Sequence, residues 1–263
     1  MRVIFLGDVV GEPGRLALYR AVPELRAEFG ADAIVVNGEN AAGGKGITPK
    51  IAREFLEKGV DVVTLGDHVW DQSDLALWLD TEPRVLRPLN LQCDNPGSGR
   101  VIIDTPSGRL GVICLHGRTF MRNGAGNPFT QGKEEATTLH HEDGVKAILV
   151  DIHAEATSEK VALGYHLDGC VSAVLGTHTH VQTADARILP GGTAYMTDAG
   201  MCGPYNSVIG RDTEPVLMSY VSCMPYKLPV GGWPAIVSGA CITIDTETGK
   251  ATEIIPINRI YEK

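Results

Sequence analysis

Five short apolar runs of this chain are each followed directly by carboxylate, amide or imidazole side chains. The polar groups stand in Gly7-Asp8, Asn37-Gly38-Glu39-Asn40, Gly66-Asp67-His68, Asp151-Ile152-His153 and Gly176-Thr177-His178-Thr179-His180. His178 and His180 are two residues apart, so in an extended segment both imidazoles point to the same face and can reach the same site. Taken singly, each polar group also fits a turn, a helix cap or a buried core histidine. Their recurrence after five runs favours one shared site.

A mixture of carboxylate and amide oxygens with imidazole nitrogens is typical of a site for Zn, Mn, Fe or Co, and not of the all-oxygen cage that binds Ca. The candidate ligands are Asp8, Glu39, Asn40, Asp67, His153, His178 and His180. They outnumber the roughly six ligands that one ion takes, whereas two ions that share a carboxylate would use them all. Pairs of ions about 3.5–4 Å apart catalyse phosphoryl transfer and some amide hydrolysis. The pattern therefore predicts a dinuclear metal site.

The elements that must position these groups are strands and helices in alternation. Interior strands, apolar on both faces, are predicted at residues 3–6, 33–36, 61–65, 147–150 and 171–175. Helices are predicted at residues 15–29, 49–58 and 157–167. Pro23 is expected to break the first helix in two, Pro49 to lie in the first turn of the second, and Thr157 or Ser158 to cap the third. Ligands bind outside the carboxyl ends of strands in α/β sheets, so the polar groups converge if these strands are neighbours.

Two further pairs of apolar runs flank turn sequences and predict antiparallel hairpins, 100–104 with 110–115 and 235–245 with 251–257. Together with the strand–helix alternation, they predict an α/β fold with a mixed sheet or a two-sheet sandwich, with helices outside. We find no domain boundary, so residues 1–263 are expected to form a single domain. Residues 118–131 contain Gly124, Gly126 and Pro128 and are predicted to form a loop or a lid.

The composition narrows the classes of function. The chain has 23 Lys and Arg against 32 Asp and Glu, a net charge of −9, which argues against a protein that coats DNA or RNA. No apolar run approaches the roughly 18 residues of a membrane helix, and Asp8 comes too early for a signal peptide. The 6 cysteines show no zinc-finger spacing, so a reducing cytoplasm is expected. Exposed hairpin strands offer edges that a homo-oligomer could cover.

The order of the polar motifs resembles that of the calcineurin-like metallophosphoesterases, which carry Gly-Asp, then Gly-Asp/Asn-His, a lone His and finally Gly-His-x-His. The corresponding residues here are Gly7-Asp8, Gly66-Asp67-His68, His153 and Gly176-Thr177-His178-Thr179-His180. Three longer stretches, residues 37–46, 151–160 and 176–185, look like signatures of the YmdB-like branch of that superfamily. The resemblance runs nearly from end to end of the chain.

This resemblance implies a four-layer αββα sandwich of two mixed β-sheets that holds two metal ions, with phosphodiesterase activity on cyclic nucleotides. Iron or manganese is favoured, and zinc is the alternative. The implied ligands of one ion are Asp8, Glu39, Asn40 and His180, and those of the other are Glu39, Asp67, His153 and His178. Glu39 is then the bridge, and His68 is the histidine that binds no metal and stands over the substrate.

This chain departs from the family pattern at three positions. The wider superfamily begins with Asp-x-His, whereas Asp8 is followed by Val9 and Val10, so Asn40 supplies the missing ligand, as the YmdB-like branch implies. Thr177 is inserted into the Gly-His-x-His motif. Asp67 stands where the family usually has Asn. The added negative charge should strengthen binding of divalent ions and make the centre less electrophilic.

The expected mechanism is attack of a metal-activated hydroxide on phosphorus, with His68 as the general acid that protonates the departing alkoxide. Asp71, three residues further on, either orients His68 or is a solvated acid at the start of a helix. Lys45 and Arg118 are further candidates for holding the substrate phosphate, although Gly43-Gly44-Lys45-Gly46 lacks the spacing of a P-loop and is interpreted as a turn.

Two other classes of protein remain open on the sequence. A dinuclear amidohydrolase uses similar ligands, but such enzymes place His-x-His on the first strand of a barrel, whereas here it comes at residues 178–180. A metal- and nucleotide-binding regulatory protein with slow or incidental catalysis is the second class, and Asp67 keeps it open. In either phosphate-binding case the expected partner is a small phosphate ester, in particular a nucleotide, and neither a long nucleic acid nor a membrane.

Overall fold

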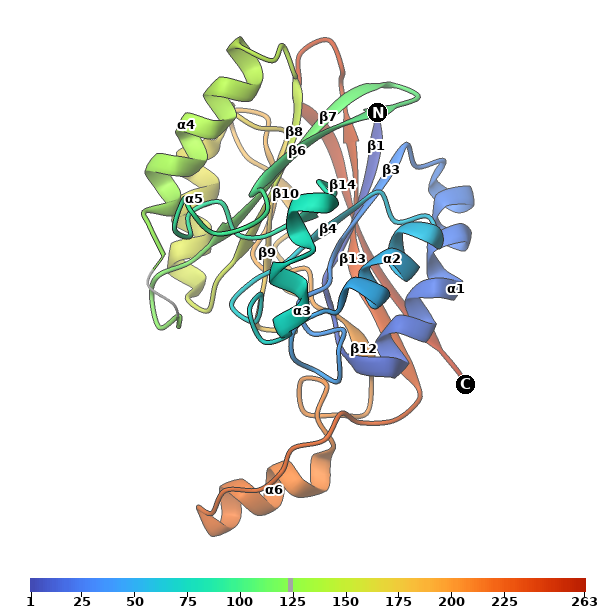
Figure 1. Cartoon of the computed structure of the whole chain (residues 1–263). Helices are drawn as coiled ribbons and strands as arrows, with labels where there is room; N and C mark the ends of the chain where they lie inside the picture. The colour runs from blue at the N-terminus through green and yellow to red at the C-terminus, as the bar shows by residue number, and fades with distance from the viewer. Residues whose placement is uncertain (123–124) are drawn as a thin grey trace.

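The computed structural model describes residues 1–122 and 125–263 as two facing β-sheets with helices on their outer faces (Figure 1). The first sheet has the strand order β2-β12-β13-β1-β3-β4-β5, with β14 paired to β13. Its strands are β1 (Arg2–Leu6), β2 (Asp8–Val9), β3 (Ala33–Asn37), β4 (Val62–Thr64), β5 (Val85–Leu86), β12 (Met201–Pro204), β13 (Ala235–Ile244) and β14 (Ala251–Tyr261). β1, β3, β4 and β5 run parallel, and β13 is antiparallel to β1, so the sheet is mixed.

The second sheet has the strand order β10-β11-β9-β8-β7-β6. Its strands are β6 (Arg100–Thr105), β7 (Gly108–His116), β8 (Ala147–His153), β9 (Ala173–Thr177), β10 (Arg187–Ile188) and β11 (Ala194–Met196). β7, β8, β9 and β11 are parallel, whereas β6 and β10 are antiparallel additions at the two edges. Both predicted hairpins are present, as β6–β7 and β13–β14.

Helices cover the outer faces of both sheets. They are α1 (Gly11–Phe29), α2 (Pro49–Glu57), α3 (Ser73–Ala76), the 3-10 helix Leu79–Thr81, α4 (Pro128–His141), α5 (Thr157–Leu167) and α6 (Thr213–Ser222). α4 and α5 lie together outside the second sheet, and α1 and α2 lie outside the first (Figure 1). In the part of the chain that the structure describes, no helix is both long and apolar enough to cross a membrane.

The side chains along β1 point alternately to two different cores, and this alternation shows why four layers form. Val3 and Phe5 belong to the core between the two sheets, whereas Ile4 and Leu6 face the core under α1 and α2. A third core lies between the second sheet and helices α4 and α5 and includes Ile148. Strands with two buried faces need a layer on either side, so the predicted αββα sandwich of two mixed sheets is confirmed.

Two local predictions about helices are wrong. Pro23 does not break α1, which runs without interruption because its buried face, including Leu18 and Leu25, packs on the first sheet while Pro23 lies on the exposed face. The residue before α5 is Ala156, and no side chain caps that end, so neither Thr157 nor Ser158 is a cap.

The segment 118–131 is only partly a loop. α4 begins at Pro128, where the Asn127 side chain accepts a hydrogen bond from the Phe129 amide and Pro128 needs no hydrogen-bond partner for its nitrogen. Residues 123–124, which fall inside the predicted lid, lie outside the described residues.

Candidate metal centre

The carboxyl ends of the parallel strands place the predicted site residues at one end of the sandwich. In the first sheet Leu6 is paired with Val36, and Asn37 with Thr64, so β1, β3 and β4 end side by side. In the second sheet His153 is paired with Thr177 at the ends of β8 and β9. The polar residues that follow or end these strands are Asp8, Glu39, Asn40, Asp67, His68, His153, His178 and His180. The two sheets therefore contribute to the same place from opposite sides.

Four of the predicted ligands form a tight cluster. The side chains of Glu39, Asp67, His153 and His178 each offer a nitrogen or oxygen atom, and these atoms all lie within 4.8 Å of one another. His153 Nε2 is 3.0 Å from Glu39 Oε1 and 3.2 Å from Asp67 Oδ1. His178 Nδ1 is 3.0 Å from His153 Nε2. Atoms bound about 2.1 Å from one ion lie roughly 3.0–3.4 Å apart in octahedral or tetrahedral geometry, so the cluster has the dimensions of one metal site.

The other predicted ligands adjoin this cluster. Asp8 is fully buried, and its Oδ1 atom has no hydrogen-bond partner, although it lies 3.8 Å from His180 Nε2 and 3.7 Å from His153 Nδ1. Asn40 Nδ2 donates to Glu39 Oε1 at 3.0 Å and lies 3.2 Å from His180 Nε2. As a ligand, Asn40 would present Oδ1, so its amide would have to turn over from this orientation. A buried carboxylate oxygen without a partner is costly, and a cation beside Asp8 would remove that cost.

His153 and His178 in the cluster and His180 beside it each fix one ring nitrogen on a protein group and turn the other toward the carboxylates. His153 Nδ1 is 2.9 Å from the Thr177 hydroxyl. His178 Nε2 is 3.2 Å from Glu155 Oε2, and His180 Nδ1 is 2.9 Å from the Ile209 carbonyl oxygen. Metal-binding histidines characteristically use their second nitrogen in this way, because the outer hydrogen bond fixes the tautomer and the orientation of the ring.

The carboxylates of the cluster and Asp8 beside it give this place a negative charge that a cation would balance. Burial alone would lower the pKa of His153, but Glu39, Asp67 and Asp8 outweigh burial and raise this pKa well above its ordinary value. Burial alone would raise the pKa of Asp67, but hydrogen bonds from His153 and His178 lower it well below its usual range. The donor set, its spacing and its charge all fit divalent ions.

The residues that orient His153 were only partly foreseen from the sequence. The Thr177 hydroxyl donates to Asp151 Oδ1 at 2.8 Å, so it accepts from His153 Nδ1 and leaves Nε2 to face the cluster. Burial raises the pKa of Asp151 to about 6, against hydrogen bonds from Thr64, Asn37 and Thr177. The alternation Asp151-Ile152-His153 placed both polar groups on one face of β8, and this was the available signal.

A buried ion pair under residues 177–179 was missed. Lys160 Nζ donates to Asp198 Oδ2 at 2.6 Å and to the Thr177 carbonyl at 2.7 Å, and the same carboxylate oxygen accepts from the Thr179 amide and hydroxyl. This pair supports the turn that carries His178 at φ 99°, a backbone conformation that L residues rarely adopt. No sequence pattern links Lys160 to Asp198, since the pairing arises only from the packing of α5.

Glycine is required at position 66 by close packing. A Cβ atom there would collide with the Glu39 carboxylate and the His153 ring. The absence of a side chain lets the chain after β4 approach the cluster and brings Asp67 to it.

A cavity of about 320 Å³ opens beside the cluster, lined by Lys45, Asp67, His68, Phe120, Met121, Arg122 and His178. A second cavity of the same size is lined by Glu39, Asn40, His68, Glu155, His178, Thr179, His180, Ile209 and Arg211. His68 borders both, and its Nδ1 atom is 2.9 Å from Asp71 Oδ2. Of the two basic residues considered for holding the substrate phosphate, Lys45 lines the first cavity, and Arg118 lines neither. Arg122 also lines the first cavity.

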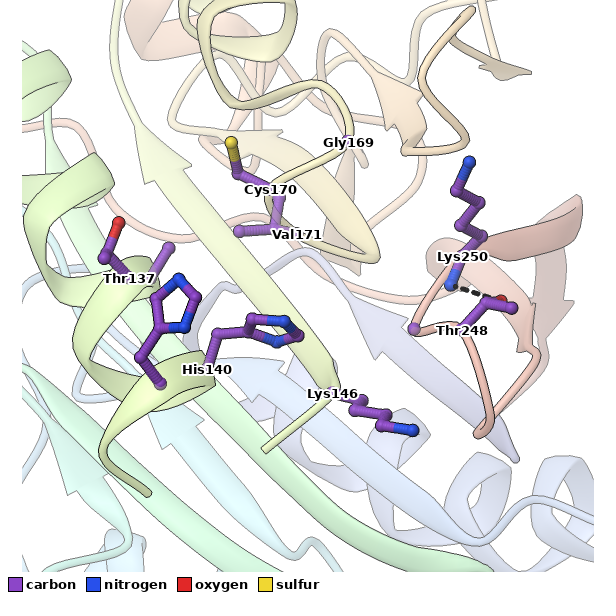
Figure 2. A pocket seen from close by; sticks show the side chains of 11 residues that line it. Thr137, His140, Lys146, Gly169, Cys170, Val171, Thr248 and Lys250 are labelled. Atoms are coloured by element: carbon purple, nitrogen blue, oxygen red, sulfur yellow. Dashed lines mark hydrogen bonds between the residues drawn. The ribbon is translucent and has the colours of Figure 1, made fainter. Parts of the chain in front are cut away.

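Another cavity, of about 280 Å³, lies away from the cluster between α4 and the β13–β14 turn (Figure 2). His140, Lys146, Cys170 and Lys250 line it, and it includes none of the predicted site residues. The cavity therefore lies at the opposite end of the strands from the polar cluster.

The chain is similar to known proteins over nearly its whole length. The family described as YmdB-like protein matches residues 4–257. The 2',3'-cyclic-nucleotide 2'-phosphodiesterase of Bacillus subtilis (strain 168) is 43% identical over 254 residues, which cover 97% of this chain and 95% of that enzyme. A crystal structure of a hypothetical protein from Thermus thermophilus has a TM-score of 0.91 at 39% identity, with 100% of both chains covered. A crystal structure of a novel phosphatase from Mycoplasma pneumoniae has a TM-score of 0.92 at 34% identity, with 100% of this chain and 94% of that one covered. The chain belongs to the YmdB-like family.

Proposed function

We propose that this chain is a metal-dependent phosphodiesterase that hydrolyses small cyclic nucleotides. The observation that carries the proposal is the arrangement of His153, His178 and His180, each anchored through one ring nitrogen and turned through the other toward buried carboxylates. The name of the Bacillus subtilis relative supports a cyclic nucleotide as substrate, and the Mycoplasma pneumoniae structure is titled a phosphatase.

The proposed cofactor is a pair of divalent ions, with iron or manganese ahead of zinc. One ion would be held by Asp8, Glu39, Asn40 and His180, and the other by Glu39, Asp67, His153 and His178. Bound ions supply Lewis acidity, which lowers the pKa of water and neutralises charge on a phosphoryl group. The oxygen of Asp8 that lacks a partner and the 4.8 Å cluster support ions in these positions.

His68 is proposed as the general acid. Asp71 Oδ2 accepts from His68 Nδ1 at 2.9 Å, which keeps a proton on that nitrogen and directs Nε2 away from Asp71. A protonated Nε2 can then donate its proton to the departing alkoxide, and the carboxylate of Asp71 stabilises the imidazolium before transfer. The backbone amide of His68 donates to Glu39 Oε2 at 3.2 Å, so the position of the acid is tied to the proposed bridging ligand.

The cavity beside His68 fits a small nucleotide better than a polymer. Lys45 and Arg122 can pair with phosphate, and the ring of Phe120, 87% exposed, offers a face on which a base can stack. The net charge of −9 disfavours a long polyanion, whereas the ions and these two cations attract a single phosphate ester locally. All six cysteines are free thiols, which supports a reducing compartment such as the cytoplasm.

The test of the reaction is a screen of phosphomonoesters, cyclic nucleotides and linear diesters with manganese, iron and zinc in turn. We expect turnover of 2',3'-cyclic nucleotides and close to two metal equivalents per chain. The regulatory alternative predicts instead a nucleotide that binds tightly in calorimetry and is not turned over. A metal-free protein that resists reconstitution would contradict the proposed site.

The test of His68 is the variant His68→Ala on an alkyl phosphodiester. Loss of a general acid lowers kcat by about 10²–10⁴-fold, and metal content should be unchanged. On an aryl ester the loss should be much smaller, because a good leaving group needs no proton. Asp71→Asn should give a smaller loss than His68→Ala on the same alkyl ester. Full activity of His68→Ala on that ester would remove His68 from the mechanism.

A further inference from the structure

Residues 117–121 follow β7 and place Phe120 in the wall of the first cavity beside His68. Phe120 has a φ of 63°, which is unusual for a bulky side chain. Backbone strain of this kind persists only where the surrounding structure holds it. The packing of the core does not require it here, because the Phe120 side chain is 87% exposed.

Strained backbone gathers around the two cavities beside the metal cluster. In the described part of the chain, the residues other than glycine with positive φ are Phe120, His178, His180, Ile209 and Cys223. The first four line these cavities, and Cys223 lies at the end of α6. His178 and His180 are candidate metal ligands, and the Ile209 carbonyl fixes His180. Since strained residues cluster at functional sites, we expect Phe120 to serve the site as well.

The loop that carries Phe120 is held by Glu159 from α5. Both carboxylate oxygens of Glu159 accept from the Arg118 amide, at 3.0 and 3.1 Å, and Oε2 also accepts from the Thr119 amide at 3.0 Å. Gly117 permits this approach, since a Cβ atom there would lie 2.8 Å from Glu159 Oε2. These contacts fix the two residues that directly precede Phe120.

The direction of the Glu159 side chain is itself informative. Glu159 is the third residue of α5, from which a glutamate commonly accepts from the amide just before its own helix. Here the N-cap residue Ala156 makes no side-chain cap, and Glu159 binds the loop instead. On the far side of Phe120, the Glu155 amide donates to Met121 Sδ at 3.2 Å. Phe120 is thus held between two anchored neighbours.

We propose that Glu159 is a positioning residue that holds the Phe120 ring as a platform for the nucleobase of the substrate, so that the chain prefers phosphodiesters that carry a base. This inference rests on the proposed function, because Phe120 lines the same cavity as Asp67 and His68. Any base can stack on an aromatic ring, so the preference is for a base as such and not for one particular base.

Steady-state kinetics of the metal-loaded full chain on two matched substrates test the platform. The substrates are adenosine 2',3'-cyclic phosphate and methyl riboside 2',3'-cyclic phosphate, which has a methoxy group in place of the base. Phe120→Ala should raise KM for the adenosine compound by about 5- to 150-fold and leave kcat nearly unchanged, because stacking stabilises the ground and transition states alike. KM for the compound without a base should not change. Phe120→Tyr keeps the ring and should behave as the wild type does.

The same substrates test Glu159. Glu159→Ala should raise KM for the adenosine compound alone, and Glu159→Gln, which keeps one acceptor oxygen, should recover part of the loss. Since Glu159 acts through the ring, the double variant Glu159→Ala/Phe120→Ala should be no worse than Phe120→Ala. Two controls lie outside both cavities and should leave both KM values unchanged. Tyr165→Ala removes a 55% exposed ring on α5, and Glu82→Ala removes a carboxylate that accepts from the Arg84 amide.

Three outcomes would overturn the proposal. These are equal kcat/KM values of the wild type on the two substrates, equal losses on both substrates in the Phe120→Ala or Glu159→Ala variant, and additive losses in the double variant. A wild-type chain that hydrolyses neither substrate contradicts the proposed function instead. Calorimetry with adenosine 3'-phosphate and methyl riboside 3'-phosphate then decides the inference by itself. Tighter binding of the adenosine compound that is lost in Phe120→Ala and in Glu159→Ala supports it, and equal binding of the two compounds overturns it.

Discussion

The strand ends of the two sheets bury carboxylates and imidazoles, whereas residues 205–228, the arm that carries α6 away from the two sheets (Figure 1), leave tyrosine, leucine and valine side chains in solvent. Asp8, Glu39 and His153 are each at most 1% exposed. Tyr220 and Val221 are each about four-fifths exposed. In these two regions polar side chains are buried and apolar ones are exposed, the reverse of the usual distribution.

The buried polar side chains and the exposed apolar ones are both unfavourable for the isolated chain. Buried carboxylates destabilise a fold unless a cation neutralises them, and exposed apolar side chains contribute nothing to a fold unless another surface covers them. The polar cluster is therefore complementary to positive charge, and the surface of the arm is complementary to another apolar surface. The base of the arm joins the two, because Ile209 accepts a hydrogen bond from His180.

The largest effect is expected from removing an imidazole of the polar cluster at the strand ends. His153→Ala deletes the nitrogen that lies within 3.2 Å of both Glu39 and Asp67. Metal content should fall, and kcat/KM on a cyclic nucleotide should drop by about 10³-fold or more, since ions supply several kcal/mol of transition-state stabilisation and about 1.4 kcal/mol is tenfold. Metal analysis and steady-state kinetics check the two parts.

The matched control is His140→Ala, at the cavity on the other end of the strands. It removes the same side chain and should leave metal content and activity unchanged. Circular dichroism establishes that both variants are folded. A folded His153→Ala protein with full metal content and activity would show that the buried cluster is structural and not a metal site.

A smaller effect is expected from the group that orients His153. Thr177→Val keeps the shape of the side chain and removes the hydroxyl that links His153 Nδ1 to Asp151. Loss of such an outer hydrogen bond weakens metal binding by about 10–100-fold. A competition titration with a chelator measures this affinity. Thr137→Val is the control, because its hydroxyl donates only to the Lys133 carbonyl within α4; equal affinities of the two variants would exclude the orienting role.

The meeting of the polar strand ends could be predicted from the sequence because the sequence signals for it are local. A strand followed by glycine and a polar residue, as at Gly66, can be recognised within a few residues of sequence. The parallel arrangement of the strands then brings several such strand ends together. The unbroken α1 was not predicted, because the propensity of Pro23 is local while the packing of Leu18 and Leu25 that holds the helix is not. The ion pair of Lys160 and Asp198 likewise depends on packing between distant segments.

The arm escaped prediction for a different reason. Residues 213–222 combine apolar and small polar side chains without a clear one-sided pattern, because nearly every face of the helix is exposed in the single chain. Periodicity reports which face a helix buries within its own fold. A helix that buries almost none of its faces leaves no such record, and its apolar residues resemble those of an ordinary core element.

The smallest effect is expected from truncating an arm residue, and it separates the two regions most directly. Leu217→Ala should change the free energy of unfolding by less than about 0.5 kcal/mol, because Leu217 is 59% exposed. Leu25→Ala, at a position 1% exposed on α1, should cost about 2–5 kcal/mol. Urea unfolding followed by circular dichroism measures both. A large cost for Leu217→Ala would mean that the arm is packed against the rest of the chain.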